Sequence, residues 1–137
     1  MSQANVERAR EGYAALSGAI RSGDLDAYFR EYADPEIEWV PMEGALDADV
    51  SVGRESVKAR LMAMLEVMGK PEIEAEEIID AGEKVFVAIH ISARGRGSGI
   101  DMEASWFHVL TARGDKLLRV EWYASRAEAL DASGLSE

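Results

Sequence analysis

The chain has 137 residues, of which 26 are acidic and 15 basic, and its formal net charge is -11. Hydrophobic residues make up 47% and charged residues 30%, which excludes a disordered or fibrous chain. The negative charge disfavours nucleic acid and anionic membranes as partners. The absence of cysteine excludes disulfides, a thiolate nucleophile and a cysteine-ligated metal. We expect one domain over residues 1–137, and a cytoplasmic location because no segment reads as a membrane span or secretion signal.

Three segments in the N-terminal half have the spacing of amphipathic helices. In the first, apolar side chains recur at steps of three and four residues, at Val6, Ala9, Tyr13, Leu16 and Ile20. Gly23 ends this helix and Asp24 caps the second. The pair Asp34-Pro35 ends the second helix, because proline disfavours helical geometry in the residue before it. The third helix runs from about Val57 to Met68.

Strands are predicted on either side of the third helix. Residues 36–40 alternate as a short strand, and the aperiodic residues 41–53 are expected to form a surface loop. From residue 72 onward the alternation has a period of two, and the doubled Glu76-Glu77 predicts a bulge. The next strand, which begins near Val85, is apolar on both sides, as in the centre of a sheet.

The C-terminal third is predicted to form two further strands and a short helix. The run Arg94–Gly99 lies between two strands, which favours a hairpin turn over a phosphate-binding loop. Strands over residues 100–111 and 117–123 follow, and the capping box Ser125–Glu128 begins a terminal helix. The element order predicts an α+β fold in which three helices pack on one face of a curved antiparallel or mixed sheet.

Several stretches, in this order along the chain, match one known family: residues 21–26 with 32–35, residues 53–57, residues 94–99 and residues 116–134. Together they resemble the SnoaL-like branch of the nuclear transport factor 2 superfamily, which includes ketosteroid isomerases and polyketide cyclases. The resemblance implies a cone-shaped, cystatin-like fold with a pocket between sheet and helices, and a homodimer formed through the sheet. It does not imply one reaction, because this fold carries both enzymes and non-enzymes.

The resemblance also indicates where relatives carry catalytic groups. The base carboxylate of ketosteroid isomerases corresponds to residues 39–40, and their second acid to residues 107–108. Their tyrosine corresponds to a position near Leu16, about one helical turn from Tyr13. The catalytic aspartate of SnoaL-like cyclases corresponds to Trp122. None of these positions holds a carboxylate. The catalytic carboxylates of both groups of relatives are therefore absent from the corresponding positions of this chain.

Strand alternation predicts what lines the pocket instead. One face of the last strand carries Leu118, Val120 and Trp122, and one face of the strand before it carries Met102, Ala104, Trp106, His108 and Leu110. Such a wall suits a planar or apolar small molecule, unless the aromatic side chains fill the space themselves. The candidate substrate-binding residues are Tyr13, Tyr32, Trp39, Trp106 and Trp122.

His108 is the candidate catalytic residue, because histidine is the side chain most able to carry a proton near neutral pH. The alternative is a hydrogen-bonded core histidine. His90 is expected opposite about Glu103, which at ~3.3 Å per residue places it on the order of 15 Å from His108. The two histidines therefore cannot share a metal ion, and we predict neither a metal nor a cofactor.

Three functions follow from these observations. The first is binding of a small apolar or aromatic ligand. The second is an isomerase, dehydratase or hydrolase that moves a proton with His108, helped by Tyr13 or Tyr32. The third is a non-enzymatic, dimeric interaction module with a filled interior. An open cavity favours the first two over the third.

Overall fold

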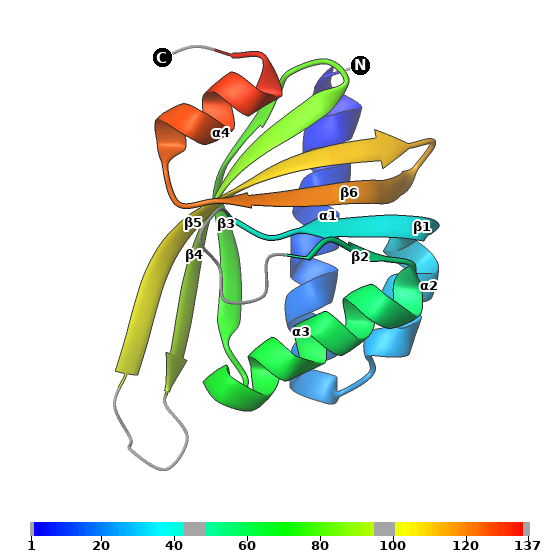
Figure 1. Cartoon of the computed structure of the whole chain (residues 1–137), viewed down its shortest axis with the longest axis vertical. Coiled ribbons are helices and arrows are strands. Elements are labelled where there is room, and N and C mark those ends of the chain that lie inside the picture. The colour runs from blue at the N-terminus through cyan, green and yellow to red at the C-terminus, as the bar shows by residue number, and fades with distance from the viewer. Residues whose placement is uncertain (1, 43–48, 95–100, 136–137) are drawn as a thin grey trace.

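The computed structural model describes residues 2–42, 49–94 and 101–135. The elements in chain order are α1 (Ser2–Ser22), α2 (Leu25–Tyr32), β1 (Ala33–Val40), β2 (Ser51–Val52), α3 (Arg54–Met68), β3 (Glu72–Asp80), β4 (Lys84–Arg94), β5 (Asp101–Arg113), β6 (Lys116–Tyr123) and α4 (Arg126–Ser133). Figure 1 shows helices packed on a curved sheet, which confirms the predicted α+β class.

The strands form one mixed sheet in the order β2-β1-β6-β5-β4-β3. Strands β3 to β6 pair as antiparallel neighbours, whereas β1 runs parallel to β6. The outer edge of β1 pairs with β2, in a stretch predicted to be loop. That prediction was wrong for Ser51–Val52, because two residues are too few to produce a detectable alternation. Residues 43–48 of the same stretch, and most of the predicted 94–99 turn, lie outside the described residues.

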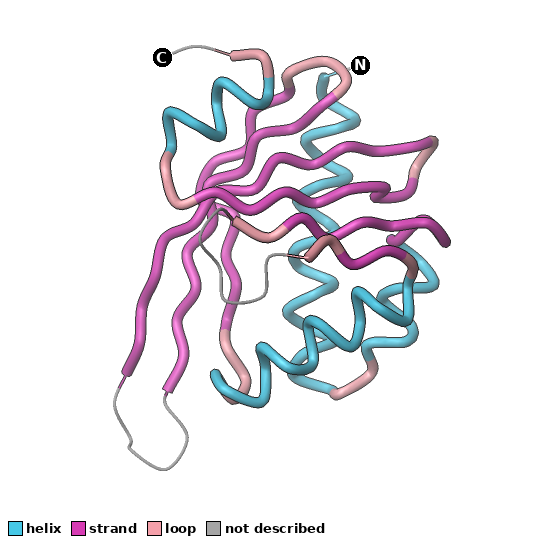
Figure 2. The backbone as a smooth tube through the Cα atoms, in the orientation of Figure 1, coloured by secondary structure: helices cyan, strands magenta, loops and turns pink. Residues whose placement is uncertain are grey.

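Helices cover both faces of the sheet. α1, α2 and α3 lie on one face and α4 lies on the other (Figures 1 and 2). Val85 and Val87 belong to the core under the first three helices, whereas Phe86 packs with Leu130 of α4. This division follows from strand geometry, because successive side chains point to opposite faces. The prediction of three helices therefore holds for one face of the sheet only. The described residues form four helices, because α4 covers the other face.

The predicted boundary between the first two helices is confirmed, whereas α2 ends at Tyr32, before the predicted break at Asp34-Pro35, and α3 begins at Arg54 rather than near Val57. Gly23 follows α1 with a φ of 83°, a left-handed conformation that glycine adopts without strain. The Asp24 carboxylate accepts a hydrogen bond from the Ala27 amide at 3.2 Å, so it caps α2 as expected. Within the described ranges, no helix combines the length and the hydrophobicity needed to span a lipid bilayer.

An ion pair fixes the beginning of β1 against the end of β5. Arg113 Nε lies 3.0 Å from Asp34 Oδ2, and its Nη2 lies 2.7 Å from Oδ1. This two-point pairing, together with the amide of Glu36, holds the pKa of Asp34 below its usual value. β1 is thereby held in a position from which Ile37 and Trp39 face the helices.

Irregular strand pairing affects which side chains face the helices, and it occurs at three places in the described sheet, one of them between Ala33 and Glu38 of β1. The bulge predicted at Glu76-Glu77 is confirmed by a register shift between Ala75 and Glu77. A second shift, between β5 and β6, pairs Thr111 with Arg119 but Ala112 with Leu117. Leu118 is the extra residue, so Leu117 takes the inner face that alternation had assigned to Leu118. The strand pattern could not reveal this, because both residues are leucine.

Candidate functional site

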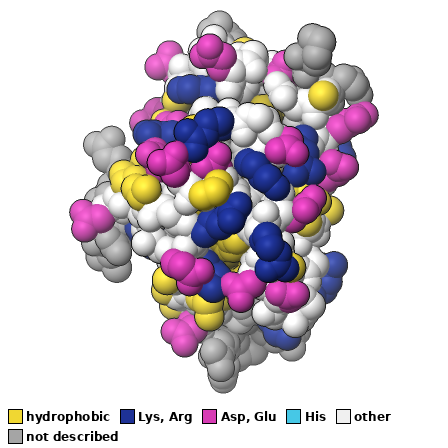
Figure 3. All heavy atoms as spheres, turned by 90° about the vertical axis from the view of Figure 1, so that its right-hand side faces the viewer, with side chains coloured by type: hydrophobic (Ala, Val, Ile, Leu, Met, Phe, Trp, Pro, Cys, Tyr) yellow, Lys and Arg dark blue, Asp and Glu magenta, His cyan; other side chains and the backbone are white. Residues whose placement is uncertain are grey.

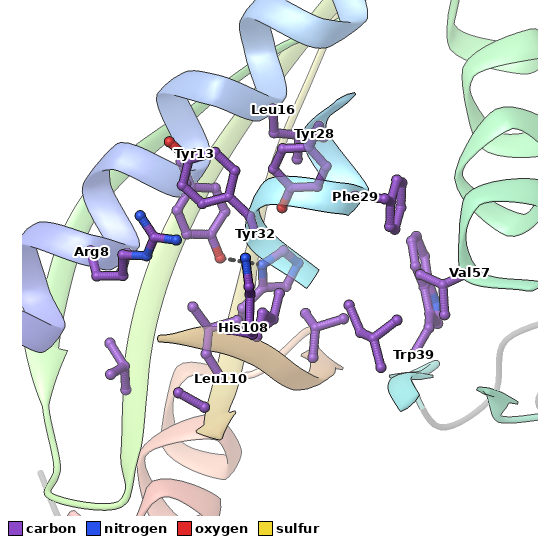
Figure 4. Close-up of a pocket in the computed structure, with 18 of the residues that line it drawn as sticks. Arg8, Tyr13, Leu16, Tyr28, Phe29, Tyr32, Trp39, Val57, His108 and Leu110 are labelled. Carbon is purple, nitrogen blue, oxygen red and sulfur yellow. Dashed lines mark hydrogen bonds between the residues drawn. The ribbon is translucent and has the colours of Figure 1, made fainter. Parts of the chain in front are cut away.

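A cavity of ≈ 150 Å³ lies between the inner face of the sheet and the three helices that cover it. Figure 4 shows side chains from several elements converging on it. Its wall is largely apolar; examples are Leu16, Phe29, Ile37, Val57, Leu61 and Val120. Asp115 is the one carboxylate among the described lining residues, and it lies in the exposed β5–β6 turn. The interior of the cavity therefore offers little that could pair with a cation.

Tyr13 and His108 form a hydrogen-bonded pair in this wall. The Tyr13 hydroxyl lies 2.5 Å from His108 Nδ1 (Figure 4). Both residues are buried, with 8% and 6% of their surface exposed. Burial lowers the pKa of His108 to about 3, and burial, with a smaller effect of Tyr28, raises the pKa of Tyr13 well above its ordinary value. Both side chains are therefore neutral at physiological pH.

The proton arrangement of this neutral pair follows from its surroundings. If Tyr13 donates to Nδ1, His108 carries its own proton on Nε2, a buried atom with no hydrogen-bond partner among the described residues. The opposite tautomer would leave two groups unpaired, the Tyr13 proton and the Nε2 lone pair. Since each unpaired buried polar group costs about 1–3 kcal/mol, we assign the first arrangement. His108 Nε2 is then an unused hydrogen-bond donor.

Two tryptophans surround the histidine. The Trp122 ring meets His108 edge to face, with centroids 4.2 Å apart and planes at 78°. Trp39 stacks on Trp122 at 5.2 Å, so β1 and β6 together form an aromatic corner. Trp122 Nε1 is also buried without a hydrogen-bond partner in the described part of the chain. A second unused donor thus lies beside the first.

Tyr28 is a cavity residue that the sequence analysis did not single out. Its ring stacks on Tyr32 at 5.5 Å, and its hydroxyl points towards the interior (Figure 4). Burial, with a smaller effect of Tyr32, raises the pKa of Tyr28 to about 12, so the hydroxyl keeps its proton. The sequence feature that could have identified Tyr28 is its spacing from Tyr32, because residues four positions apart lie on the same face of a helix.

The structure brings most of the sequence-predicted site residues together. Those that line the cavity are Tyr13, Tyr32, Trp39, His108 and Trp122. Trp106 packs against the core cluster on the same side of β5 but is not part of the cavity wall. Sequence reasoning also missed Arg8 and Lys116, which line the mouth of the cavity. Both stand in polar stretches whose pattern contains nothing specific to a site.

His90 lies on the other face of the sheet. It pairs with Ser105 rather than with Glu103, two residues from the expected register. Its Nε2 still lies 2.9 Å from Glu103 Oε1, because the two side chains share that face. In the described ranges, no group of three or more histidine, aspartate or glutamate side chains could hold a metal ion.

Comparison with known proteins agrees with this architecture. A family model described as a SnoaL-like domain matches residues 10–120. The chain belongs to the SnoaL-like domain family. No curated protein matches it significantly.

Solved structures of similar fold extend the comparison. A protein from a Jannaschia species, named as a SnoaL-like polyketide cyclase, is 15% identical, with a TM-score of 0.76 over 100% of this chain and 96% of that one. TerC, co-crystallised with polyporic acid, is 21% identical, with a TM-score of 0.69 over 90% and 96%. A ketosteroid isomerase-like protein from Catenulispora acidiphila, in complex with trimethylamine, is 17% identical, with a TM-score of 0.61 over 79% and 81%. At these identities the similarity shows a shared fold.

Proposed function

We propose that this SnoaL-like protein binds a small, flat, largely apolar molecule with an oxygen that accepts a hydrogen bond from His108 Nε2. The observation that carries the proposal is the Nε2 donor of the Tyr13–His108 pair, which has no partner in the described part of the chain and belongs to a residue of the apolar cavity wall. Because surrounding side chains cover Nε2 itself, a ligand oxygen reaches it when those side chains shift. An unpaired buried donor is costly for the empty protein. A ligand oxygen that pairs with it recovers that free energy, which favours binding.

The size and walls of the cavity narrow the class of ligand. A dry apolar cavity of roughly 150 Å³ accepts a benzene-sized molecule, and the ≈ 150 Å³ here is continuous with an open mouth. The aromatic corner of Trp39 and Trp122 favours stacking with a planar ring. We therefore expect a ligand of one or two rings.

The polar groups of the wall favour an acceptor on the ligand. His108 Nε2 and Trp122 Nε1 can only donate in the assigned state, and the Tyr28 hydroxyl can donate as well. A ketone, aldehyde or quinone oxygen meets these requirements. A ligand with only donors would leave the same protein groups unpaired.

Binding is better supported than proton transfer. A general base works best when its pKa lies near the working pH, whereas burial lowers the pKa of His108 to about 3. We therefore assign His108 the role of a neutral hydrogen-bond donor.

The homodimer stays a prediction, and light scattering of the purified chain tests it.

Solved structures of the same fold support a small-molecule role. TerC was crystallised with polyporic acid, and the Catenulispora protein with trimethylamine. These ligands differ in shape and polarity. The ligand of this chain is accordingly inferred from its own cavity, not from theirs.

The test compares two ligands of similar shape, 2-acetylnaphthalene and 2-ethylnaphthalene, by titration calorimetry. We expect the ketone to bind roughly 3- to 10-fold more tightly, as one neutral hydrogen bond would produce. The double variant Tyr13→Phe/His108→Phe should keep affinity for the hydrocarbon and lose the preference for the ketone. The variant His90→Gln, on the other sheet face, should behave as wild type. Equal affinities in wild type, or no binding of either compound, would contradict the proposal.

A further inference from the structure

Two cationic side chains meet at the mouth of the cavity. Arg8 from α1 and Lys116 from the start of β6 both belong to its lining. Arg8 Nη2 lies 3.4 Å, and Lys116 Nζ 2.6 Å, from the same carbonyl oxygen of Glu31. The two positive groups are therefore neighbours, although they come from opposite ends of the chain.

Arg8 is held in place mainly by neutral groups. Its Nε donates to the Asp115 carbonyl at 3.1 Å, and its guanidinium lies 4.5 Å over the Tyr32 ring. The Glu11 carboxylate is 3.9 Å from Nη1 and its side chain is 62% exposed. A pair so long and so exposed contributes little. The guanidinium is thus oriented but hardly neutralised.

The positive charge of Lys116 is likewise bonded to neutral backbone groups. In the described part of the chain its ammonium donates to two backbone carbonyls, those of Glu31 and Arg30. Asp115 contributes its carbonyl to Arg8, and no ion pair of its carboxylate is found within the described ranges. Two like charges held close together repel each other, and an anion between them removes that repulsion. Figure 3 shows the face on the right-hand side of Figure 1, where Lys and Arg side chains gather near the middle with hydrophobic atoms between them and Asp and Glu side chains around them.

We infer that the ligand is an amphipathic carboxylate whose ring enters the cavity and whose carboxylate stays at the mouth, between Arg8 and Lys116. This inference rests on the proposed function, because it needs the cavity to be a binding site. Arg8 suits this role, because its guanidinium keeps N–H donors on Nη1 and Nη2 beyond the hydrogen bonds to the Asp115 and Glu31 carbonyls. The attraction of an anionic ligand is confined to the surroundings of Arg8 and Lys116, because the chain as a whole has a net charge of -11.

The first experiment uses the wild-type protein and two ligands that differ at one terminal group, the anionic 3-(2-naphthyl)propanoate and the neutral 3-(2-naphthyl)propanamide. We expect calorimetry to show at least 10-fold tighter binding of the acid at low ionic strength. Added salt should reduce this preference and leave the affinity for the amide unchanged, because the mouth is open to screening by solvent ions.

The second experiment uses charge variants at the mouth. Arg8→Gln and Lys116→Gln should each weaken binding of the acid 5- to 10-fold and leave the amide unaffected. Asp115→Asn should strengthen acid binding about 2-fold, because it removes a nearby negative charge. The matched control is Arg10→Gln, which removes an exposed cation of α1 that does not line the cavity.

The outcomes separate this inference from the proposed function. Equal binding of acid and amide in wild type, with the ketone preference intact, would overturn the mouth assignment alone. A salt-independent preference, or equal loss of both ligands in the Arg8 and Lys116 variants, would overturn it as well. If neither these ligands nor 2-acetylnaphthalene binds, the proposed function and this inference are both contradicted.

Discussion

The hydroxyl of Tyr13 and Nδ1 of His108 lie 2.5 Å apart although 95 positions separate them in the sequence. α1 supplies the first side chain and β5 the second, so the contact exists only once the helix lies across the sheet. It places a neutral hydrogen-bonded pair in an apolar wall. Stability, pH dependence and ligand binding therefore depend on the same two residues.

Removing the Tyr13 hydroxyl should destabilise the fold. The variant Tyr13→Phe leaves His108 Nδ1 buried without its partner, and we expect a loss of about 1–3 kcal/mol in the free energy of unfolding. Urea denaturation measures it. The double variant with His108→Phe should recover part of the loss, because both polar partners are then gone. Tyr32→Phe is the control, with an expected change below about 0.5 kcal/mol; a similar loss in this variant would argue against a special role for the pair.

The pKa of His108 predicts how stability changes with pH. Its ordinary value is 6.5, and burial lowers it to about 3 in the folded protein. Between these values the unfolded chain binds more protons, so the free energy of unfolding falls as the pH falls below about 6.5. From pH 7 to pH 5 this one group should remove about 2 kcal/mol.

Two variants isolate this contribution to the pH dependence. Denaturation at pH 7 and pH 5 should show a smaller difference in Tyr13→Phe/His108→Phe than in wild type. His90→Gln, which leaves His108 in place, should keep the wild-type difference. A double variant as pH-sensitive as wild type would show that other groups dominate in this range.

Gly12 offers a way to close the cavity without disturbing the backbone. It lines the cavity, and a Cβ added there would lie 3.9 Å from Tyr32 Cδ1, an ordinary contact. Gly12→Ala should stabilise the protein by about 0.5–1 kcal/mol, because alanine is the better helix residue. Gly12→Leu should fill part of the cavity and weaken binding of 2-acetylnaphthalene at least 10-fold.

The matched control for Gly12→Leu is Gly18→Leu. Gly18 lies on the same helix, does not line the cavity, and has room for a Cβ 3.9 Å from Arg21 Nη2. Circular dichroism should show both variants folded, and calorimetry should show that only Gly12→Leu loses the ligand. Loss in both variants would mean that α1 packing, and not cavity volume, limits binding.

The cap of α4 should matter for the outer face of the sheet. Ser125 Oγ accepts a hydrogen bond from the Glu128 amide at 3.2 Å. Ser125→Ala should lower the free energy of unfolding by about 1 kcal/mol, whereas Ser125→Asp keeps an acceptor and should change it little. Urea denaturation of the two variants distinguishes loss of the cap from loss of the serine side chain as such.

Local patterns predicted the elements and the faces of their side chains with few errors. The helix boundaries at Gly23 and Asp24 and the bulge near Glu76 depend on residues adjacent in sequence, and all were confirmed. Alternation also placed His108 and Trp122 on one face, and both line the cavity. The errors included Leu118, which a bulge turns away from the cavity, β2, which is too short to show a period, Trp106, which does not line the cavity, and the partner of His90, which is Ser105.

The sequence by itself determined the α+β class and the inward face of each strand, because periods of 3.6 and 2 are local properties of the backbone. Only the tertiary structure decided which distant residues meet. The Tyr13–His108 pair and the shared contact of Arg8 and Lys116 with Glu31 depend on where α1 and α2 cross the sheet. That placement is set by packing of the whole core, which no single segment encodes.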